Sequence, residues 1–465
     1  MLIVGLDPKK KEPLYQQIYY GIREEIKTGA IPFEAKLPSS RRLAKHLDVS
    51  RNTVDLAYEQ LAAEGYIESR PRSGFYVCKI EELASLNIPV KIKEEPVPVQ
   101  EKIPFDFSPV GVDMTQFPYH IWRKLLKEIM IDDNSELFQK GDPQGDFELR
   151  QAIMYYLSQS RGVHASTGQI VIGAGMENLL FLLRQVLGKN QIIGIENPVY
   201  TNAHGILKEL EFQICPVSMD KEGLNVKKLE ETKANLAYVT PAHQYPTGVV
   251  MPIGRRGQLI HWAKEKEDRY IIEDDYDSEF RYHGKPIPAL QGLDQSDKVI
   301  YMGTFSKAIA PAIRISYMVL PKRLIPAYKK TLGIFSCAVS RIDQKVLTLF
   351  LREGHFERHL NRMRNIYKEK HDILLECMKE MGNIVSVSGQ GAGLHVITDF
   401  KIEETDRFEE ELKKQGVRIY PLSHYYIEGK PFKEQYILGF TRMKKNDIIE
   451  GTGKIKEILS KIIEK

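Results

Sequence analysis

A lysine and an arginine near the middle of this 465-residue chain have the types and spacing needed to hold a carbonyl compound that carries a phosphate. Lys307 ends the run Thr304-Phe305-Ser306-Lys307, and Arg314 follows seven residues later. A lysine amine forms a Schiff base with a carbonyl compound when it is partly desolvated or close to another cation. Arginine presents a planar fork of donors that matches a phosphate. We therefore expect Lys307 to bind a phosphorylated aldehyde covalently.

The residues that must position this run belong to a long stretch in which apolar runs alternate with helical segments. From residue 105 to 465 the alternation predicts an α/β fold with a largely parallel central sheet. Active sites in such sheets lie at the carboxyl ends of the strands. The expected strands are Ile170–Ile172, Gln191–Ile195, Leu236–Val239, Tyr270–Ile272, Val299–Met302 and Ser316–Leu320. The expected helices between them include Asn178–Val186, Gly254–Lys266 and Leu324–Leu332.

Several of these strands are followed by residues that suit a phosphorylated ring. Backbone N–H groups at a helix start can hold a phosphate. A buried carboxylate is costly unless it meets a cation, such as a protonated pyridine nitrogen, and a tyrosine can stack on a flat ring. Any one such residue is more often structural, but their succession at strand ends predicts a single site. They are the turn Gly173-Ala174-Gly175-Met176-Glu177 for the phosphate, a carboxylate among Glu273, Asp274 and Asp275 for the cation, and Tyr200 for stacking.

The N-terminal part of the chain has the pattern of three helices and a two-stranded wing. Apolar residues at four-residue spacing predict a helix over Leu14–Thr28. Ser39 or Ser40 can cap a second helix, and a third starts at Ser50. The pieces Tyr66–Glu68 and Phe75–Cys78 then form the wing. The pattern predicts a winged helix-turn-helix.

Side chains at the helix starts and at the wing tip can reach DNA bases or phosphates. The alternative is a three-helix module used only for protein contacts, and the clustering of arginines at these places favours DNA. The expected DNA-binding residues are Arg41, Ser50, Arg51, Asn52, Thr53, Arg72, Ser73 and Gly74.

A stretch rich in Lys, Glu, Pro and Val separates the two parts. Four prolines within residues 79–104 favour an extended, semi-rigid tether. The expected organisation is a DNA-binding domain at 1–78, a linker at 79–104 and a second domain at 105–465. We divide the second domain into a large subdomain at about 105–335 and a small one at about 336–465.

Composition limits the remaining possibilities. The net charge is only +4, so nucleic-acid binding must come from a local patch. The four cysteines are far apart and show no metal-ligand spacing, which predicts no metal site. Because no apolar run is long enough to span a bilayer, we expect no membrane partner and a cytoplasmic location.

The stretch LPSSRRLAKHLDVSRNTVDLAYEQLAAEGYIESRPRSGFYV resembles the DNA-binding domain of the GntR class of bacterial regulators. The match covers most of the N-terminal module. It implies that the partner is a double-stranded DNA operator.

Residues 105–465 resemble the fold-type I pyridoxal-phosphate enzymes of the aspartate aminotransferase class. The resemblance implies pyridoxal 5′-phosphate as cofactor and Lys307 as the Schiff-base lysine. It also implies that Asp274 pairs with the pyridine nitrogen, which keeps the ring an electron sink. Tyr276 would bond the ring oxygen and Tyr200 would stack on the ring. The phosphate ligands implied are Thr304, Arg314 and the Gly175–Glu177 turn.

The fusion of these two parts is the architecture of the MocR family of regulators, which includes the GabR-like proteins. The resemblance implies a head-to-tail homodimer, in which each DNA-binding module packs against the partner's large domain. It also implies a small amine or amino-acid effector that displaces Lys307 from the cofactor to form an external aldimine.

The chain departs from the family pattern where an effector would bind. Gln244-Tyr245 stands where aminotransferases have Asn before Pro-Thr-Gly, and Asn202 stands where GabR-like proteins have a carboxylate-binding arginine. Ile437 occupies the place of the arginine in the aminotransferase Arg-x-x-Phe motif. Arg418 is then our candidate for binding an effector carboxylate, and Arg442 is the reserve.

Three functions fit these observations. The first is a pyridoxal-phosphate-dependent transcription regulator that senses an amine or amino acid. The second is an aminotransferase with a non-essential N-terminal module, in which Lys307 also moves a proton. The third is a regulator that reports the level of the cofactor itself. We favour the first and expect any aminotransferase activity to be weak.

Overall fold

The computed structural model describes residues 6–7, 12–79, 103–131, 135–282, 287–431 and 433–463. It divides the chain into two compact units, Met1–Gln100 and Glu101–Lys465. Residues 80–102, most of the expected linker, lie outside the described residues.

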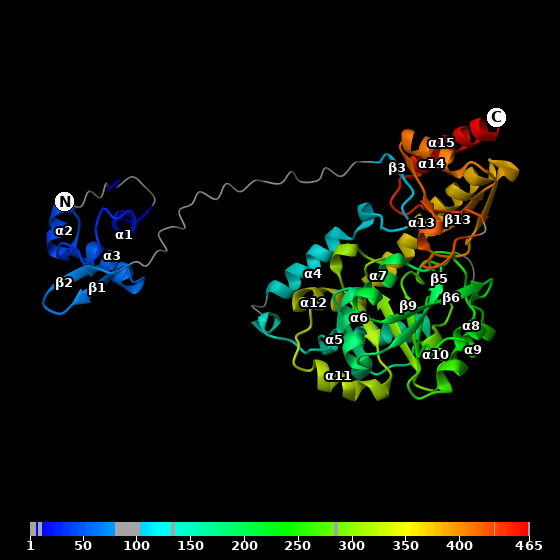
Figure 1. Ribbon diagram of the computed structural model, residues 1–465, viewed down its shortest axis with the longest axis horizontal. Coiled ribbons are helices and arrows are strands. Elements are labelled where there is room, and N and C mark those ends of the chain that lie inside the picture. Colours follow the sequence, from blue (N-terminus) through cyan, green and yellow to red (C-terminus); the bar gives the residue numbers. More distant parts are fainter. Residues whose placement is uncertain are drawn as a thin grey trace. The chain divides into compact units, whose positions relative to one another are not determined.

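The N-terminal unit is a three-helix bundle with a hairpin (Figure 1). Its helices are α1 (Leu14–Lys27), α2 (Ser40–Leu47) and α3 (Arg51–Ala63), and its strands β1 (Ile67–Arg70) and β2 (Gly74–Val77) pair antiparallel. The Ser39 and Ser50 hydroxyls cap α2 and α3 by accepting hydrogen bonds from the amides of Arg42 and Thr53. The winged helix-turn-helix is thus confirmed. The first wing strand begins one residue later than predicted, because the Tyr66 amide is still bonded to the end of α3, at the Leu61 carbonyl.

The C-terminal unit is built on an eight-stranded sheet in the order β4-β11-β10-β9-β8-β5-β6-β7. Strands β10, β9, β8, β5 and β6 run parallel to one another. Strand β11 is antiparallel to both β10 and β4, and β7 is antiparallel to β6. The C-terminal ends of β4, β5, β8, β9 and β10 therefore meet at one edge. The bounds are β4 (Ile170–Gly173), β5 (Ile192–Asn197), β6 (Gln213–Asp220), β7 (Gly223–Leu224), β8 (Leu236–Val239), β9 (Tyr270–Asp275), β10 (Val299–Thr304) and β11 (Ser316–Val319).

Both faces of this sheet are covered, which explains why its strands are almost wholly apolar. In β9, Ile271 packs with Trp262 of α9 (Ile253–Lys264), whereas the next residue, Ile272, lies in the core on the opposite face, with α6 (Met176–Leu187) and α7 (Thr201–Glu209). The α/β fold with a mostly parallel sheet is confirmed. Further helices around it are α4 (Tyr119–Ile131), α5 (Phe147–Arg161), α8 (Val226–Glu230), α10 (Leu290–Leu293), α11 (Ile325–Leu332), α12 (Arg341–Arg352) and α13 (His355–Lys379).

A second sheet of four antiparallel strands, β12-β13-β16-β15, forms the C-terminal part. In Figure 1 its strand β13 lies beside α13, α14 and α15. The chain enters this region from the N-terminal side as well, because β3 (Phe105–Asp106) pairs in parallel with β14 (Val417–Arg418). The other bounds are β12 (Val385–Ser388), β13 (His395–Phe400), β15 (Tyr420–Pro421), β16 (Tyr436–Gly439), α14 (Thr405–Lys414) and α15 (Lys445–Ile463).

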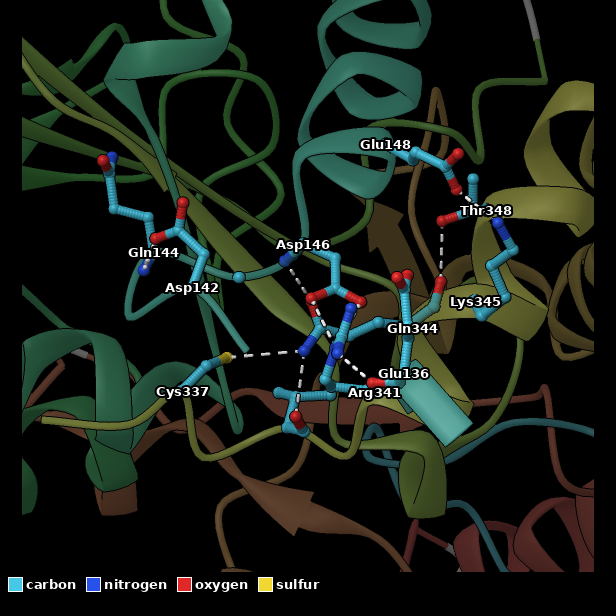
Figure 2. Close-up of polar contacts among 12 residues, drawn as sticks. Glu136, Asp142, Gln144, Asp146, Glu148, Cys337, Arg341, Gln344, Lys345 and Thr348 are labelled. Carbon is cyan, nitrogen blue, oxygen red and sulfur yellow. Dashed lines mark hydrogen bonds and ion pairs between the residues drawn. The ribbon is translucent and has the colours of Figure 1, made fainter. Parts of the chain in front are cut away.

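A polar network fastens the segment before α5 to α12 and to the edge of the main sheet (Figure 2). Arg341 binds both carboxylate oxygens of Asp146, at 3.0 and 3.1 Å, and the Gln344 amide oxygen accepts from the Asp146 backbone at 2.7 Å. On the other side, the Gln144 carbonyl accepts from the amide of Ile172 in β4 at 2.8 Å. The network therefore braces β4 close to the turn that opens α6.

Within the described ranges, no helix is long and apolar enough to cross a membrane.

Candidate cofactor site and DNA-binding surface

A cavity of about 280 Å³ opens at the sheet edge where the strands end. Its walls come from the ends of β8, β9 and β10, from the starts of α6 and α7, and from the segment around Gly111. The structure brings nine of the predicted site residues together in its lining: Met176, Glu177, Tyr200, Asn202, Asp274, Tyr276, Thr304, Lys307 and Arg314.

Asp274 lies at the end of β9, buried, and one of its carboxylate oxygens has no partner among the described residues. The other oxygen accepts a hydrogen bond from the Tyr238 hydroxyl. The unpaired one, Oδ1, is inaccessible to water. Burial raises the pKa of Asp274 from 3.8 to about 7, and the nearby Asp275 and Asp277 carboxylates add to the rise. An unsatisfied carboxylate at this place suits a cationic ligand atom in the cavity.

Lys307 follows β10 and is half-buried against the same cavity. Burial lowers the pKa of its amine, and the neighbouring Asp277 carboxylate opposes that effect. A lower pKa leaves more of the amine unprotonated, which is the form that attacks a carbonyl.

The start of α6 forms the end of the cavity where the sequence predicts a phosphate. Gly175 caps that helix with φ 92°, and a Cβ there would lie 1.9 Å from a guanidinium nitrogen of Arg314. Only glycine therefore lets Arg314 lie across the first turn of the helix. Arg314 forms an ion pair with Glu177, and its guanidinium also lies 3.4 Å from the Ala174 carbonyl oxygen.

Hydroxyl groups complete this end. The Thr304 Oγ1 accepts hydrogen bonds from the Ser316 hydroxyl at 2.8 Å and from the Ser306 amide at 3.1 Å. The Ser306 hydroxyl is buried and has no partner in the described structure. A bound phosphate would supply the acceptor that this hydroxyl lacks.

Aromatic side chains form one wall. Tyr200 packs edge-on against Tyr245, with ring centroids 5.2 Å apart, and its hydroxyl accepts from the Asn202 side-chain amide at 3.0 Å. Tyr245 in turn packs edge-on against Tyr276 at 5.7 Å.

Gln244 does not replace the asparagine that aminotransferases have near this place. Its amide nitrogen donates to the carbonyls of Pro198 at 3.0 Å and Tyr245 at 2.8 Å, and its oxygen accepts from the Thr247 amide at 3.0 Å. Both ends of the side-chain amide are thus hydrogen-bonded to nearby backbone groups, and Gln244 is not among the residues that line the cavity.

The two expected effector arginines lie in different places. Arg418, on β14, lines another hollow, with Pro104 and His424. Arg442 is exposed, and its side chain packs over Gly111, which lines the cavity: a Cβ on Gly111 would meet the Arg442 Cδ at 2.2 Å. The structure therefore places Arg442, and not Arg418, beside a residue that lines the cavity, and we call this part of the cavity its mouth.

Residues 112–433 match the family model described as aminotransferase class I and II, and residues 14–77 match that of the bacterial regulatory proteins of the gntR family. The uncharacterized HTH-type transcriptional regulator YdeL of Bacillus subtilis is 42% identical over 96% of this chain and 96% of its own. The probable rhizopine catabolism regulatory protein MocR of Rhizobium meliloti is 31% identical over 97% of this chain and 94% of its own. The chain belongs to the MocR-like family of transcription regulators.

Among solved structures, the C-terminal unit of this MocR-like regulator is similar to the kynurenine aminotransferase of Pyrococcus horikoshii in complex with PMP. The two share 28% sequence identity with a TM-score of 0.68, over 77% of this chain and 91% of the other. The sequence-based family prediction is thus confirmed.

Pyridoxal 5′-phosphate is the cofactor of this MocR-like regulator, and the cavity fits it at both ends. The unpaired Asp274 oxygen suits a protonated ring nitrogen. The glycine turn, Arg314 and the unpaired Ser306 hydroxyl suit a phosphate, and the half-buried Lys307 lines the same cavity.

The predicted DNA-binding residues lie on the surface of the N-terminal unit. Arg41, Arg51, Asn52 and Arg72 are exposed, and the Arg51 side chain, 71% exposed, makes one ion pair at 3.4 Å with Asp55. Three hydroxyls are already engaged, because Ser50 bonds Thr53 at 2.8 Å and Ser73 bonds Tyr76 at 2.7 Å. At the wing tip, Arg72 and Gly74 both have positive φ, 62° and 107°.

Sequence reasoning missed several residues around the cavity. Ser306, Tyr245 and Thr240 line it, while Tyr238 and His243 bond residues that do. Glu196 is buried, its pKa is raised to about 7 by burial, and it accepts hydrogen bonds from Thr240. All of them lie within strands of the main sheet or in the segment that follows one. Position relative to a strand end was therefore the signal in the sequence that could have found them.

Proposed function

We propose that this regulator senses a small amine or amino acid at its cofactor and thereby changes how its N-terminal unit binds DNA. The observation that carries the proposal is the half-buried Lys307, whose pKa is lowered, in the cofactor cavity of a chain that also has a complete winged helix. When bound, pyridoxal phosphate supplies an aldehyde that combines reversibly with amines. An effector amine can therefore compete with Lys307 for it.

The residues of the cavity divide into those that orient the ring and those that hold the phosphate. We assign Asp274 to the ring nitrogen, Tyr276 to the ring oxygen and Tyr200 to stacking on the ring face. We assign Gly175, Met176, Glu177, Thr304 and Arg314 to the phosphate end. The free Asp274 oxygen and the Arg314 position over Gly175 support these assignments.

Two residues are candidates for binding an effector. Asn202 is exposed, and its side-chain amide donates to the Tyr200 hydroxyl. Arg442 packs over Gly111 at the mouth of the cavity. We assign the effector contact to Asn202 and Arg442. With one arginine at the mouth and none at position 202, a carboxylate gains a single charged partner, which favours sensing over rapid turnover of amino acids.

The DNA partner is a double-stranded operator read by α3 and the wing. Arg51 and Asn52 lie at the start of α3, where side chains meet base edges, and Arg41 and Arg72 are placed for phosphates. A regulator that works on DNA in this way acts in the cytoplasm.

A homodimer completes the proposal. Large apolar side chains are exposed on and near α4: Tyr119 (58%), Ile131 (64%) and Phe138 (70%). Exposed apolar surface of this kind marks a contact face. A second copy in head-to-tail arrangement would cover it and would present two DNA-binding units to two half-sites.

The experiment is a DNA-binding titration of the cofactor-loaded full chain, with the intergenic DNA upstream of its own gene, against amines, amino acids and dipeptides. We expect one class of amine to shift both the visible absorption band and the DNA affinity, and Lys307→Ala to abolish both responses. A response to added cofactor alone would favour cofactor sensing. Steady turnover of an amino donor with a keto acid would favour the aminotransferase, because the fold is shared with one.

A further inference from the structure

His243 lies buried beside the cavity, in the loop that follows β8, and is 2% exposed. Its Nδ1 is 3.0 Å from the Tyr276 hydroxyl and 3.0 Å from a carboxylate oxygen of Asp277. An ionised carboxylate can only accept, so Nδ1 carries the hydrogen and donates to Asp277, with the Tyr276 oxygen as its second acceptor. The Tyr276 hydroxyl also has the Asp277 carboxylate as a hydrogen-bond partner. Because this tyrosine lines the cavity, a bound ring oxygen would compete with Asp277 for its hydrogen.

The other side of the His243 ring faces the C-terminal sheet region. Gly393 approaches so closely that a Cβ there would lie 1.9 Å from the His243 Cε1. The ring of His395, in β13, is 5.3 Å away. Nε2 of His243 is buried without a partner in the described structure. One imidazole thus touches both the residue assigned to the cofactor's ring oxygen and the segment that leads into β13.

We propose that His243, held by Asp277, is a positioning residue that aims the Tyr276 hydroxyl at the cofactor's ring oxygen and couples that bond to the segment 392–395. The proposal rests on the proposed function, since it requires the cofactor in the cavity. It also accounts for the missing asparagine, because Gln244 is committed to its own loop and cannot supply the donor to the ring oxygen.

Loss of His243 should change the pH midpoint of the cofactor's visible band in a predictable direction. A donor to the ring oxygen stabilises its ionised form, and so helps the proton of the Schiff base to leave as the pH rises. An N–H donated to the Tyr276 oxygen makes its hydroxyl a stronger donor. Loss of His243 therefore raises the pH at which the visible band is half lost.

Other titratable groups around His243 are accounted for. Asp277 and Tyr276, which follow β9, face His243, and so does His395 of β13. The Asp277 carboxylate in turn acts to raise the pKa values of Lys307 and Asp274. His395 stays neutral, because burial and the neighbouring His243 lower its pKa to about 3, and its Nε2 donates to the Pro246 carbonyl at 2.8 Å.

The test is a pH titration of the visible band in cofactor-loaded full-length protein, comparing wild type with His243→Phe, His243→Asn and Tyr276→Phe. We expect His243→Phe to raise the midpoint by about 0.5–1 pH unit, and Tyr276→Phe to raise it further. His243→Asn keeps a donor near the Nδ1 position and should restore part of the shift. The double variant His243→Phe/Tyr276→Phe should match Tyr276→Phe alone, because both changes remove the same bond.

The surface variant His261→Asn, whose side chain is 77% exposed, is the matched control and should leave the midpoint unchanged. An unchanged midpoint in His243→Phe, beside a clear shift in Tyr276→Phe, overturns the proposal, as do additive shifts in the double variant. Failure of wild type to take up any cofactor refutes the proposed function as well. A shift of the midpoint in Tyr276→Phe would show that the cofactor is bound beside Tyr276. The comparison with His243→Phe then tests the role of His243 alone.

Hydrogen exchange reports the coupling separately. Cofactor loading of wild type should slow exchange of the Gly393 amide, which bonds the Phe280 carbonyl at 2.7 Å, and of its neighbours. In His243→Phe this slowing should disappear, while slowing at the first turn of α6 remains. Equal protection of residues 392–395 in wild type and His243→Phe overturns the coupling.

Discussion

The DNA-binding surface and the cofactor cavity of this regulator present their functional side chains in opposite ways. On the N-terminal unit, Arg51 and Arg72 extend into water with few contacts of their own. At the cavity, Asp274 in its wall and His243 beside it are buried and hydrogen-bonded to neighbours, and Lys307 is half-buried. Surface side chains can be exchanged with little effect on folding, whereas buried polar groups contribute to both stability and function.

The largest expected effect is at Lys307. Lys307→Ala removes the amine that joins the cofactor, so the visible band and the response of DNA binding to any amine should both be lost completely. The fold should remain, because the residue is not part of a hydrophobic core cluster. Absorption spectroscopy and DNA titration of the same sample check this, and a retained band would refute the role of Lys307.

At the DNA surface we expect a large loss of affinity without loss of stability. Arg51→Ala with Arg72→Ala should weaken operator binding by 10-fold or more, at about 1–3 kcal/mol for each contact. The melting temperature and the cofactor band should not change. Arg352→Ala, an exposed arginine of the C-terminal unit, is the control, and equal operator affinity in the double variant would contradict the assignment.

Asp274 should make the cofactor-free protein less stable as the pH rises. Its pKa is about 7 in the folded state and near 3.8 when unfolded, so between these values the unfolded chain releases a proton that the folded chain keeps. The unfolding free energy therefore falls from about pH 4 to 7. Asp274→Asn should remove about 2–4 kcal/mol of that fall, measured by denaturant unfolding at several pH values.

Cofactor binding should favour wild type over the Asp274→Asn variant. When loaded, wild type gains a cationic partner for the carboxylate and Asp274→Asn does not, so the variant should bind pyridoxal phosphate more weakly. A variant that equals wild type in both tests would contradict the assignment of Asp274 to the ring nitrogen.

The smallest expected effect is at the mouth of the cavity. Asn202→Arg places a second cation near Arg442 and should improve the response to amino acids by a few-fold relative to the matching amines without a carboxylate. Asn202→Gln is the control, since it keeps an amide. Equal gains for both classes of ligand would show that position 202 does not contact the carboxylate.

Much of this arrangement could be predicted from the sequence, because it depends on local patterns. Apolar strands and serine caps placed β4, β8 and the three N-terminal helices within a residue or two. Strand β6 was missed because its side chains are mostly half-exposed and it contains Pro216, so it lacks the continuous apolar run of its neighbours.

The cavity was predictable where a residue directly follows a strand, as for Asp274 and Lys307. It was not predictable where the contact joins distant parts of the chain. The sequence favoured Arg418 and kept Arg442 as the reserve, and only tertiary packing places Arg442 over Gly111. The pairing of His243 with Asp277 likewise depends on how β8 and β9 end side by side.

The short pairing of β3 with β14 fixes the position of the chain directly after the expected linker. The Phe107 amide donates to the Arg418 carbonyl at 3.0 Å, and the Gly439 amide of β16 donates to the Phe107 carbonyl at 2.8 Å. The chain that follows the linker is therefore hydrogen-bonded to the four-stranded sheet. Any movement of the four-stranded sheet when a ligand binds would therefore also move residues 105–107, where the linker ends.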